Sequence, residues 1–359
     1  MKLAILGTRG VPPNYGGFET FAAELGKRLV ARGHDVSVYC REAGPETWEG
    51  IRRIVLPSFS HKYLETVSHA FLSAMDALRR DFDVVLVCNA ANAFVLPILS
   101  AKRMRTAINV DGIERKRRKW NVLGRMVYAA GETMSVSFAD AVVADADVIA
   151  RYYREHYAVE PVTIGYGSDF PDEADSDVLG RLGLEPGQYL LYVSRFEPEN
   201  NPLEVVHAYE RLGGTAPPLV MLGKGLYAHD LVQGLHRHAG PKILFPGALY
   251  GADYRTLQRR ALLYIQATEV GGTHPALIEA MASGGAVLAH DTPENREVGG
   301  DAVGYFRLRP HETLSGTIRE WLVNRDLRET YRARARKRAA DRYSWKAVTD
   351  AYEHLFSSL

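Results

Sequence analysis

The sequence predicts an α/β protein in which two parallel sheets are each covered by helices on both faces. Short runs rich in Val, Ile and Leu alternate with longer segments of helical spacing, and this alternation occurs in both halves of the chain. Within the runs, polar and apolar residues do not alternate, which is typical of strands buried on both faces of a parallel sheet. The length of 359 residues favours two domains.

The first half contains the apolar runs of one sheet, separated by helical patterns. We expect strands at residues 2–7, 35–40, 52–57, 83–88, 106–111 and 141–146. Residues 18–33 and 63–80 have apolar side chains at helical spacing, and Gly33 stands where a helix commonly ends.

The second half repeats this organisation. We expect strands at residues 189–195, 219–223, 242–247, 261–266 and 286–291, with helices at 202–212 and 275–283. The final part of the chain has helical spacing that is interrupted at Tyr343-Ser-Trp345.

The segment 165–177 is rich in Gly, Pro and Asp and lies near the middle of the chain, which predicts a domain boundary there. Two α/β domains of similar size would face each other across a cleft. Ligands of open parallel sheets bind at the carboxyl ends of the strands, in such a crevice.

Composition excludes several classes of protein. With 46% hydrophobic and 24% charged residues the chain is neither disordered nor fibrous, and it has no apolar run long enough to span a membrane. We expect no signal peptide, and Cys40 and Cys88 form no disulfide framework, so a cytoplasmic location is expected. The net charge of +1 gives no reason to expect nucleic acid. No His or Cys spacing suits a metal, so neither a metal nor a cofactor is expected.

A glycine-containing loop follows the first expected strand. Gly16 and Gly17 directly precede an amphipathic helix, where backbone can approach a ligand closely and the helix N-terminus can hold an anion or a sugar. An ordinary flexible loop is the alternative. The loop lacks GxGxxG, so a dinucleotide site is disfavoured.

Two cations follow strands of the second half. Arg195 ends one strand and Lys224 follows the next, and two cations at neighbouring strand ends suit a diphosphate. Solvated surface charges are the alternative for each. The Gly-Lys-Gly sequence is not a complete phosphate-binding loop motif.

The segment 269–284 combines a glycine pair, a helix cap, a proline in the first turn and a carboxylate one turn later. Free backbone N–H groups would meet an anion there, and the carboxylate would accept hydrogen bonds from sugar hydroxyls. A solvated carboxylate is the alternative. The residues concerned are Gly272, Thr273, His274 and Glu279.

Asp111 and Glu114 follow a strand of the first half and precede a basic run, residues 115–119. Two acids at a strand end suit a catalytic role. They suit equally a turn with a salt bridge to the basic run, and both interpretations stay open.

Several of these segments resemble one family, the retaining GT-B glycosyltransferases of family 4. Residues 12–19 resemble its PPxxGGxE pattern, and the segment before Glu279 resembles its E-x7-E block followed by EAMASG. Ser194-Arg-Phe resembles its GRL, residues 166–169 its hinge, and residues 343–345 its FSW. Thr8-Arg-Gly-Val-Pro and Asp111-Gly-Ile-Glu are similar to a bacterial subgroup that contains rhamnosyltransferases of capsule, exopolysaccharide and cell-wall assembly.

The resemblance implies two Rossmann-like domains facing a cleft, the GT-B fold. Residues 1–167 would bind the acceptor, residues 168–342 would bind a nucleotide-diphosphate sugar, and residues 343–359 would form a helix that crosses back to the first domain.

The family's site residues carry over position by position. Arg195 matches the diphosphate arginine, Glu279 the ribose-binding glutamate, and Thr273 and His274 positions whose amides approach the sugar and phosphate. Gly16 and Gly17 match the loop that closes over the donor. The expected catalytic residues are Asp111, Arg195 and Lys224, and the expected substrate-binding residues are Gly16, Gly17, Glu114, Asn200, Gly272, Thr273, His274 and Glu279.

Three positions depart from the family pattern. The first glutamate of E-x7-E falls at Gly271, with Glu269 two residues early. The lysine after GRL falls at Asn200, so Lys224 would supply that cation. Asp111 stands in place of a histidine on the first-domain loop.

The sequence therefore predicts a retaining, metal-independent transferase. It would move a hexose or deoxyhexose, rhamnose among them, from a nucleotide-diphosphate sugar to a glycan or lipid-linked glycan acceptor in bacterial polysaccharide assembly. The alternatives are a nucleotide-sugar epimerase of the same architecture and a non-catalytic nucleotide-sugar-binding subunit.

Two basic runs stand out in the first half, residues 101–105 and 115–119, the second followed by Trp120. Such runs favour peripheral contact with an anionic membrane, with Trp120 at the headgroups, at the inner face of the plasma membrane. A solvated charged loop is the alternative.

Overall fold

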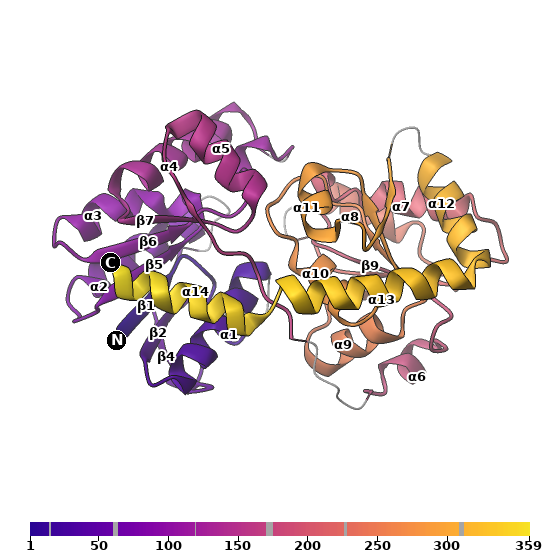
Figure 1. The fold of residues 1–359 in the computed structure, drawn as a ribbon, viewed down its shortest axis with the longest axis horizontal. Helices are drawn as coiled ribbons and strands as arrows, with labels where there is room; N and C mark the ends of the chain where they lie inside the picture. Colours follow the sequence, from indigo (N-terminus) through magenta and orange to yellow (C-terminus); the bar gives the residue numbers. More distant parts are fainter. Residues whose placement is uncertain (14–15, 60–63, 119, 170–174, 226–227, 309–311) are drawn as a thin grey trace. The chain divides into compact units, whose positions relative to one another are not determined.

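In the computed structural model, the chain divides into two compact units (Figure 1). Unit 1 comprises residues 1–166 and 345–359, and unit 2 comprises residues 167–344. The structure describes all residues except 14–15, 60–63, 119, 170–174, 226–227 and 309–311. Parts of the predicted glycine loop, helix 63–80, boundary segment and second basic run fall in those ranges and lie outside the described residues.

Unit 1 is built on a sheet of order β3-β4-β2-β1-β5-β6-β7-β8, in which only the β3–β4 pair is antiparallel among the described strands. The central strands β1, β5 and β6 are apolar runs with almost no exposed surface, because helices cover both faces of the sheet. The strands are β1 (Lys2–Leu6), β2 (Asp35–Cys40), β3 (Thr47–Trp48), β4 (Ile51–Val55), β5 (Val84–Cys88), β6 (Arg105–Asn109), β7 (Ala141–Ala144) and β8 (Val162–Thr163).

The helices of unit 1 are amphipathic and bury one stripe each. In the first of them, Phe21, Leu25 and Leu29 recur at four-residue spacing and are fully buried. The helices are α1 (Gly17–Ala31), α2 (Leu64–Ala77), α3 (Leu96–Ser100), α4 (Val122–Phe138), α5 (Asp147–Tyr157) and α14 (Trp345–Ser358), with short 3-10 helices η1 (Ala90–Val95) and η2 (Glu114–Lys116).

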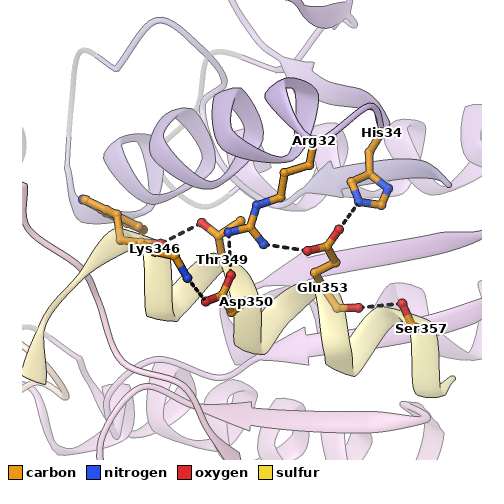
Figure 2. A network of polar contacts seen from close by, with 8 residues as sticks. Arg32, His34, Lys346, Thr349, Asp350, Glu353 and Ser357 are labelled. Carbon is orange, nitrogen blue, oxygen red and sulfur yellow. Dashed lines mark hydrogen bonds and ion pairs between the residues drawn. The ribbon is translucent and has the colours of Figure 1, made fainter.

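The last helix, α14, belongs to unit 1 and is held there by core and surface contacts. Tyr352 is fully buried, and its hydroxyl accepts a hydrogen bond of 2.8 Å from the Asn109 side chain. At the surface the Arg32 guanidinium pairs with Asp350 and Glu353, each at 2.6 Å, and Glu353 also contacts His34 at 2.7 Å (Figure 2).

Unit 2 is a fully parallel sheet of order β11-β10-β9-β12-β13-β14. Its strands are β9 (Leu190–Val193), β10 (Leu219–Leu222), β11 (Ile243–Gly247), β12 (Leu263–Gln266), β13 (Val287–His290) and β14 (Gly304–Phe306). Its helices are α6 (Val178–Leu182), α7 (Pro202–Glu210), α8 (His229–His236), α9 (Gly251–Arg260), α10 (Pro275–Ala282), α11 (Pro293–Gly299), α12 (Glu312–Val323) and α13 (Arg325–Arg342), with a short 3-10 helix η3 (Pro198–Asn200).

The predicted fold class is confirmed, since both units are parallel α/β sheets. Every expected strand overlaps a strand of the structure, and the expected break at Tyr343-Ser-Trp345 separates α13 from α14. The sequence analysis missed β3, β8 and β14, because strands of two or three residues are too short to show a hydrophobic period.

Candidate functional site

The candidate site of unit 2 lies where the strand order of the sheet reverses. Strand β9 has β10 on one side and β12 on the other. The chain proceeds from β9 to β10 and β11 on one side of the sheet, and from β12 to β13 and β14 on the other side. In open α/β sheets this arrangement forms a crevice at the carboxyl ends of the strands. Arg195, Lys224 and the segment 267–274 follow β9, β10 and β12 at that edge.

Arg195 is carried by a loop that is fixed through backbone groups. Its carbonyl oxygen accepts hydrogen bonds from the side chains of Asn200 at 2.6 Å and Ser194 at 2.9 Å. Asn200 is 5% exposed and so acts as a support of this loop. The guanidinium of Arg195 is partly exposed and makes no hydrogen bond or ion pair within the described part of the chain.

The loop that carries Lys224 lies against the β9 loop at a distance that only glycine permits. A Cβ at Gly223, whose φ is +150°, would stand 1.8 Å from the carbonyl oxygen of Ser194, and one at Gly225 would stand 2.8 Å from that of Phe196. The Phe196 amide donates to the Lys224 carbonyl at 3.1 Å. The structure therefore brings the two predicted cations to adjacent loops, with the Lys224 side chain exposed.

The loop after β12 is attached to the same loop of β9. The Glu269 amide donates to the Glu199 carbonyl at 2.9 Å, and the Asn201 side chain donates to the Ala267 carbonyl at 2.8 Å. Three strand ends are thus joined by backbone hydrogen bonds around Arg195.

His274 is the N-cap residue of α10, and Pro275 follows at the first helical position, as the sequence suggested. Its ring Nδ1 lies 2.8 Å from Oδ1 of Asn295. The Asn295 amide nitrogen donates to the carbonyls of Thr268 and His290, at 3.1 and 2.9 Å. Since that nitrogen is the donor, Oδ1 must accept, and the proton of a neutral His274 ring therefore sits on Nδ1.

The ring of His274 explains why glycine stands at position 271. A Cβ at Gly271 would lie 2.3 Å from the His274 Nε2 atom, well inside contact distance. His274 itself is 9% exposed. At position 271, where the family pattern has its first glutamate, the space for a side chain is therefore occupied by the His274 ring, which is hydrogen-bonded to Asn295.

Glu279 lies one turn into α10. Its side chain is partly buried, so it is not the fully solvated carboxylate that the sequence left as an alternative. Its Oε2 accepts a hydrogen bond from the Tyr254 hydroxyl of α9, which in turn accepts one from Gln258 at 2.8 Å. Burial, with the Glu279 carboxylate nearby, holds the pKa of Tyr254 well above its usual range, so this phenol remains a donor. Thr273 and Gly272 precede the helix and are buried.

In unit 1, Asp111 follows β6 in a left-handed conformation with φ of +58°. Its amide donates to the Asn109 side chain at 3.0 Å, and Asn109 also contacts Tyr352 of α14. Asp111 is partly exposed, in a turn built by its own neighbours. Its catalytic role stays a prediction.

Glu114 forms a buried ion pair with Arg117, with 2.5 Å between Oε1 and Nε. This is the salt bridge that the sequence left open as the alternative for this acid. Arg115 contacts Glu132 of α4, at 3.4 Å. A substrate contact for Glu114 stays a prediction, but its carboxylate already has a structural partner.

The glycine loop ends at α1, with Gly16 as the N-cap residue and Gly17 as the first residue of the helix. The sequence analysis did not place Glu19 at a site, although it is the last residue of the PPxxGGxE pattern. Glu19 is 4% exposed, and its Oε1 accepts the Arg9 amide at 2.8 Å, which ties the loop after β1 to the helix. Burial raises the pKa of Glu19.

Two further features of the described residues bear on function. No group of three or more His, Cys, Asp or Glu side chains among them is placed to hold a metal ion. None of the described helices combines the length and the apolar character needed to span a bilayer.

Comparison with known proteins places each unit in a family. The model "Glycosyltransferase Family 4" matches residues 15–167, and "Glycosyl transferases group 1" matches residues 181–338, so the two together span most of the chain. The chain belongs to the family 4 glycosyltransferases of the GT-B fold. The resemblance seen in the sequence motifs is confirmed at this level.

Solved glycosyltransferase structures share this fold. Sucrose-phosphate synthase from Thermosynechococcus elongatus is 17% identical with a TM-score of 0.83, and both chains are covered completely. Anabaena Alr3699/HepE in complex with UDP and glucose is 16% identical with a TM-score of 0.82, again over the whole of both chains.

Curated relatives match part of the glycosyltransferase chain. The phosphatidyl-myo-inositol mannosyltransferase of Mycolicibacterium smegmatis is 28% identical over 212 residues, which cover 58% of this chain and 54% of the relative. That of Mycobacterium tuberculosis H37Rv is 27% identical over 228 residues, covering 60% and 59%. The match therefore spans little more than half the length of these relatives.

Proposed function

We propose that this glycosyltransferase moves a hexose or deoxyhexose from a nucleotide-diphosphate sugar to a glycan or lipid-linked glycan acceptor, with retention at the anomeric carbon and without a metal. The observation that carries the proposal is the convergence of three strand ends of unit 2 around the loop that carries Arg195, whose guanidinium makes no hydrogen bond or ion pair within the described part of the chain.

The donor diphosphate fits this edge of unit 2 electrostatically. Arg195 offers planar paired N–H donors, Lys224 adds a second positive charge on the adjacent loop, and α10 begins nearby with the positive end of its dipole. A donor of this class is also supported by the Anabaena structure, which is described in complex with UDP and glucose.

We assign recognition of the donor's nucleoside to Glu279. A carboxylate accepts hydrogen bonds from vicinal hydroxyls such as those of ribose. The Tyr254 hydroxyl holds Oε2 of Glu279, and Gln258 holds the Tyr254 hydroxyl, so the carboxylate is oriented before a ligand arrives. Preorganisation of this kind reduces the entropy that binding must overcome.

The chemistry then needs no protein nucleophile. The acceptor oxygen bonds to the anomeric carbon while the bond from that carbon to the diphosphate oxygen breaks on the same face. The acceptor proton passes to the departing diphosphate. Negative charge grows on the diphosphate, and Arg195, Lys224 and the α10 amides stabilise it. Asp111 in unit 1 would orient the acceptor hydroxyl.

The proposal leaves two sugars to compare. The motifs at residues 8–12 and 111–114 are similar to those of rhamnosyltransferases, whereas the curated relatives are named mannosyltransferases. The lipid in the relatives' name supports a lipid-linked acceptor. Both sugars fall within the proposed class.

The first experiment measures donor binding. Thermal unfolding is followed with GDP-mannose, dTDP-rhamnose and UDP-glucose, and a donor at about 100 times its Kd raises the stability by roughly 2.7 kcal/mol. We expect Arg195→Ala to weaken binding of that donor about 10- to 100-fold, since a hydrogen bond to a charged group contributes about 1.5–3 kcal/mol. Arg237→Ala, an exposed cation after α8, is the matched control and should bind as the wild type does. Equal donor affinity in both variants would refute the site.

The second experiment measures turnover. Release of nucleoside diphosphate that depends on acceptor supports transfer, whereas a changed nucleotide sugar indicates epimerisation. We expect Asp111→Asn to lower kcat more than donor affinity. If donor affinity falls while kcat is unchanged, Asp111 belongs to the donor site or to the scaffold.

A further inference from the structure

Helix α4 exposes four large apolar side chains on its first two turns. Val122, Leu123, Met126 and Val127 are 74, 69, 63 and 54% exposed. Val122 and Met126, like Leu123 and Val127, are four residues apart and therefore adjacent on the helix surface. We call these residues the α4 apolar face. A contiguous exposed apolar patch on a folded domain marks an interaction site.

The opposite face of α4 explains why this one is left outside the core. Gly131 packs so closely on η1 that a Cβ there would lie 2.3 Å from the Ala90 carbonyl oxygen. Glu132 and Ser135 are buried on the same side, and Glu132 accepts the Tyr152 hydroxyl of α5 at 2.8 Å. In Figure 1, α4 and α5 lie side by side in unit 1. Small and polar residues thus anchor this part of α4, and the four apolar residues of its first two turns point away from the core.

Cations border the α4 apolar face. Lys116 and Arg118 precede the helix, Arg125 lies on the helix beside the face, and all three are exposed. Arg115 and Arg117, the other described cations of this run, form ion pairs with Glu132 and Glu114. The exposed positive charge beside the face therefore comes from Lys116, Arg118 and Arg125.

The structure also places the described parts of the two basic runs and Trp120. Residues 101–105 lead into the start of β6 and residues 115–118 follow its end, so the described parts of the two basic runs lie toward opposite ends of one strand. Trp120 packs on α4 itself, with its ring 5.1 Å from that of Tyr128. This packing makes Trp120 a support of the helix, and its place at lipid headgroups stays a prediction.

We propose that the α4 apolar face, with Lys116, Arg118 and Arg125, docks on an anionic lipid bilayer. Apolar side chains that enter the headgroup region beside cations that meet lipid phosphates are the chemistry of interfacial helices. The inference rests on the proposed function in one respect. Asp111, the residue expected to orient the acceptor, stands at the start of the segment that leads from β6 into α4. Docking of α4 on a bilayer would therefore bring a lipid-linked acceptor toward Asp111.

The charge arm of the test uses co-sedimentation with vesicles, without donor or acceptor, so that its outcome is independent of transferase activity. We expect the wild type to bind phosphatidylglycerol–phosphatidylcholine vesicles more tightly than phosphatidylcholine alone, and less tightly at high salt. The variant Lys116→Gln/Arg118→Gln/Arg125→Gln should lose about a hundredfold in partitioning. The matched control Lys102→Gln/Arg103→Gln/Arg105→Gln removes three exposed cations at the other end of β6 and should lose far less.

The apolar arm uses Leu123→Gln/Met126→Gln, which keeps good helix formers in α4. We expect at least a tenfold loss of vesicle binding with unchanged thermal unfolding. The control is Val67→Gln/Phe71→Gln, an exposed apolar pair four residues apart on α2, at 43 and 45% exposure. Equal losses in the two pairs, or no loss in the α4 variants, would overturn the proposal. So would concentration-dependent self-association of the wild type that the α4 variants abolish, because the face would then bind a second copy.

Discussion

Replacing Gly271 with alanine tests whether the His274 ring fixes the shape of the loop after β12. The new Cβ would lie 2.3 Å from His274 Nε2, against 3.4 Å or more in ordinary contact. The ring is buried and held by Asn295, so it has little room to move. Overpacking of this kind costs about 1–3 kcal/mol, which lowers the Tm of a domain of this size by roughly 2–10 °C.

The assay is a double-mutant cycle followed by thermal unfolding. His274→Ala leaves the Asn295 oxygen without its donor and is itself destabilising, but the cycle subtracts that effect. In the His274→Ala background we expect Gly271→Ala to cost less than about 0.5 kcal/mol, because the ring is gone. Gly234→Ala on α8, where an added Cβ meets nothing within 4 Å, is the control and should be neutral or stabilising. If Gly271→Ala costs the same in both backgrounds, the ring is not the obstacle.

Three further outcomes follow from unit 1. Glu114→Ala should lower the free energy of unfolding by about 3–5 kcal/mol in urea, because it leaves Arg117 buried without its carboxylate. Glu19→Gln should raise the Tm at neutral pH: burial raises the pKa of Glu19, so the folded state favours the protonated acid and wild-type stability rises as the pH falls toward the unfolded pKa. Cys40 and Cys88 should resist thiol reagents in the folded protein, since both are buried and burial raises the pKa of each thiol.

Each of these outcomes has a contrary result. Glu160→Ala removes an exposed partner of Arg154 and should cost under about 0.5 kcal/mol, so an equal loss in the Glu114 variant would show that burial of the pair is unimportant. A Glu19→Gln advantage that persists unchanged at acid pH, where Glu19 is protonated in the wild type, would contradict the titration argument. Rapid labelling of both cysteines in the native state would contradict their burial.

The sequence was sufficient for features that depend on local pattern. Buried strands show as apolar runs, and a cation directly after such a run, as at Arg195, must lie at a strand end. Orientation of a side chain by a distant partner has no local signal. Asn295 of α11 contacts His274, and the local sequence around neither residue indicates this contact.

Helix α4 shows the opposite limit of sequence reasoning. Apolar residues at helical spacing normally predict a face turned to the core. Here Gly131, Glu132 and Ser135 occupy the packed side, where η1 approaches too closely for a Cβ at position 131, and Leu123 and Met126 are exposed. Periodicity gives the faces of a helix, but only the contacts of the neighbouring element decide which of them is covered.

The membership of α14 in unit 1 has a consequence for biosynthesis. Ribosomes deliver residues 1–166 first, yet the buried Tyr352 and the ion pairs of Asp350 and Glu353 arrive only after all of unit 2 has been made. Unit 2, which is one continuous stretch, can close on the ribosome. Unit 1 must wait with part of its core uncovered until residues 345–359 emerge, so its synthesis begins before that of unit 2 but its core is completed afterwards. In the interval between, the nascent chain most needs protection from aggregation.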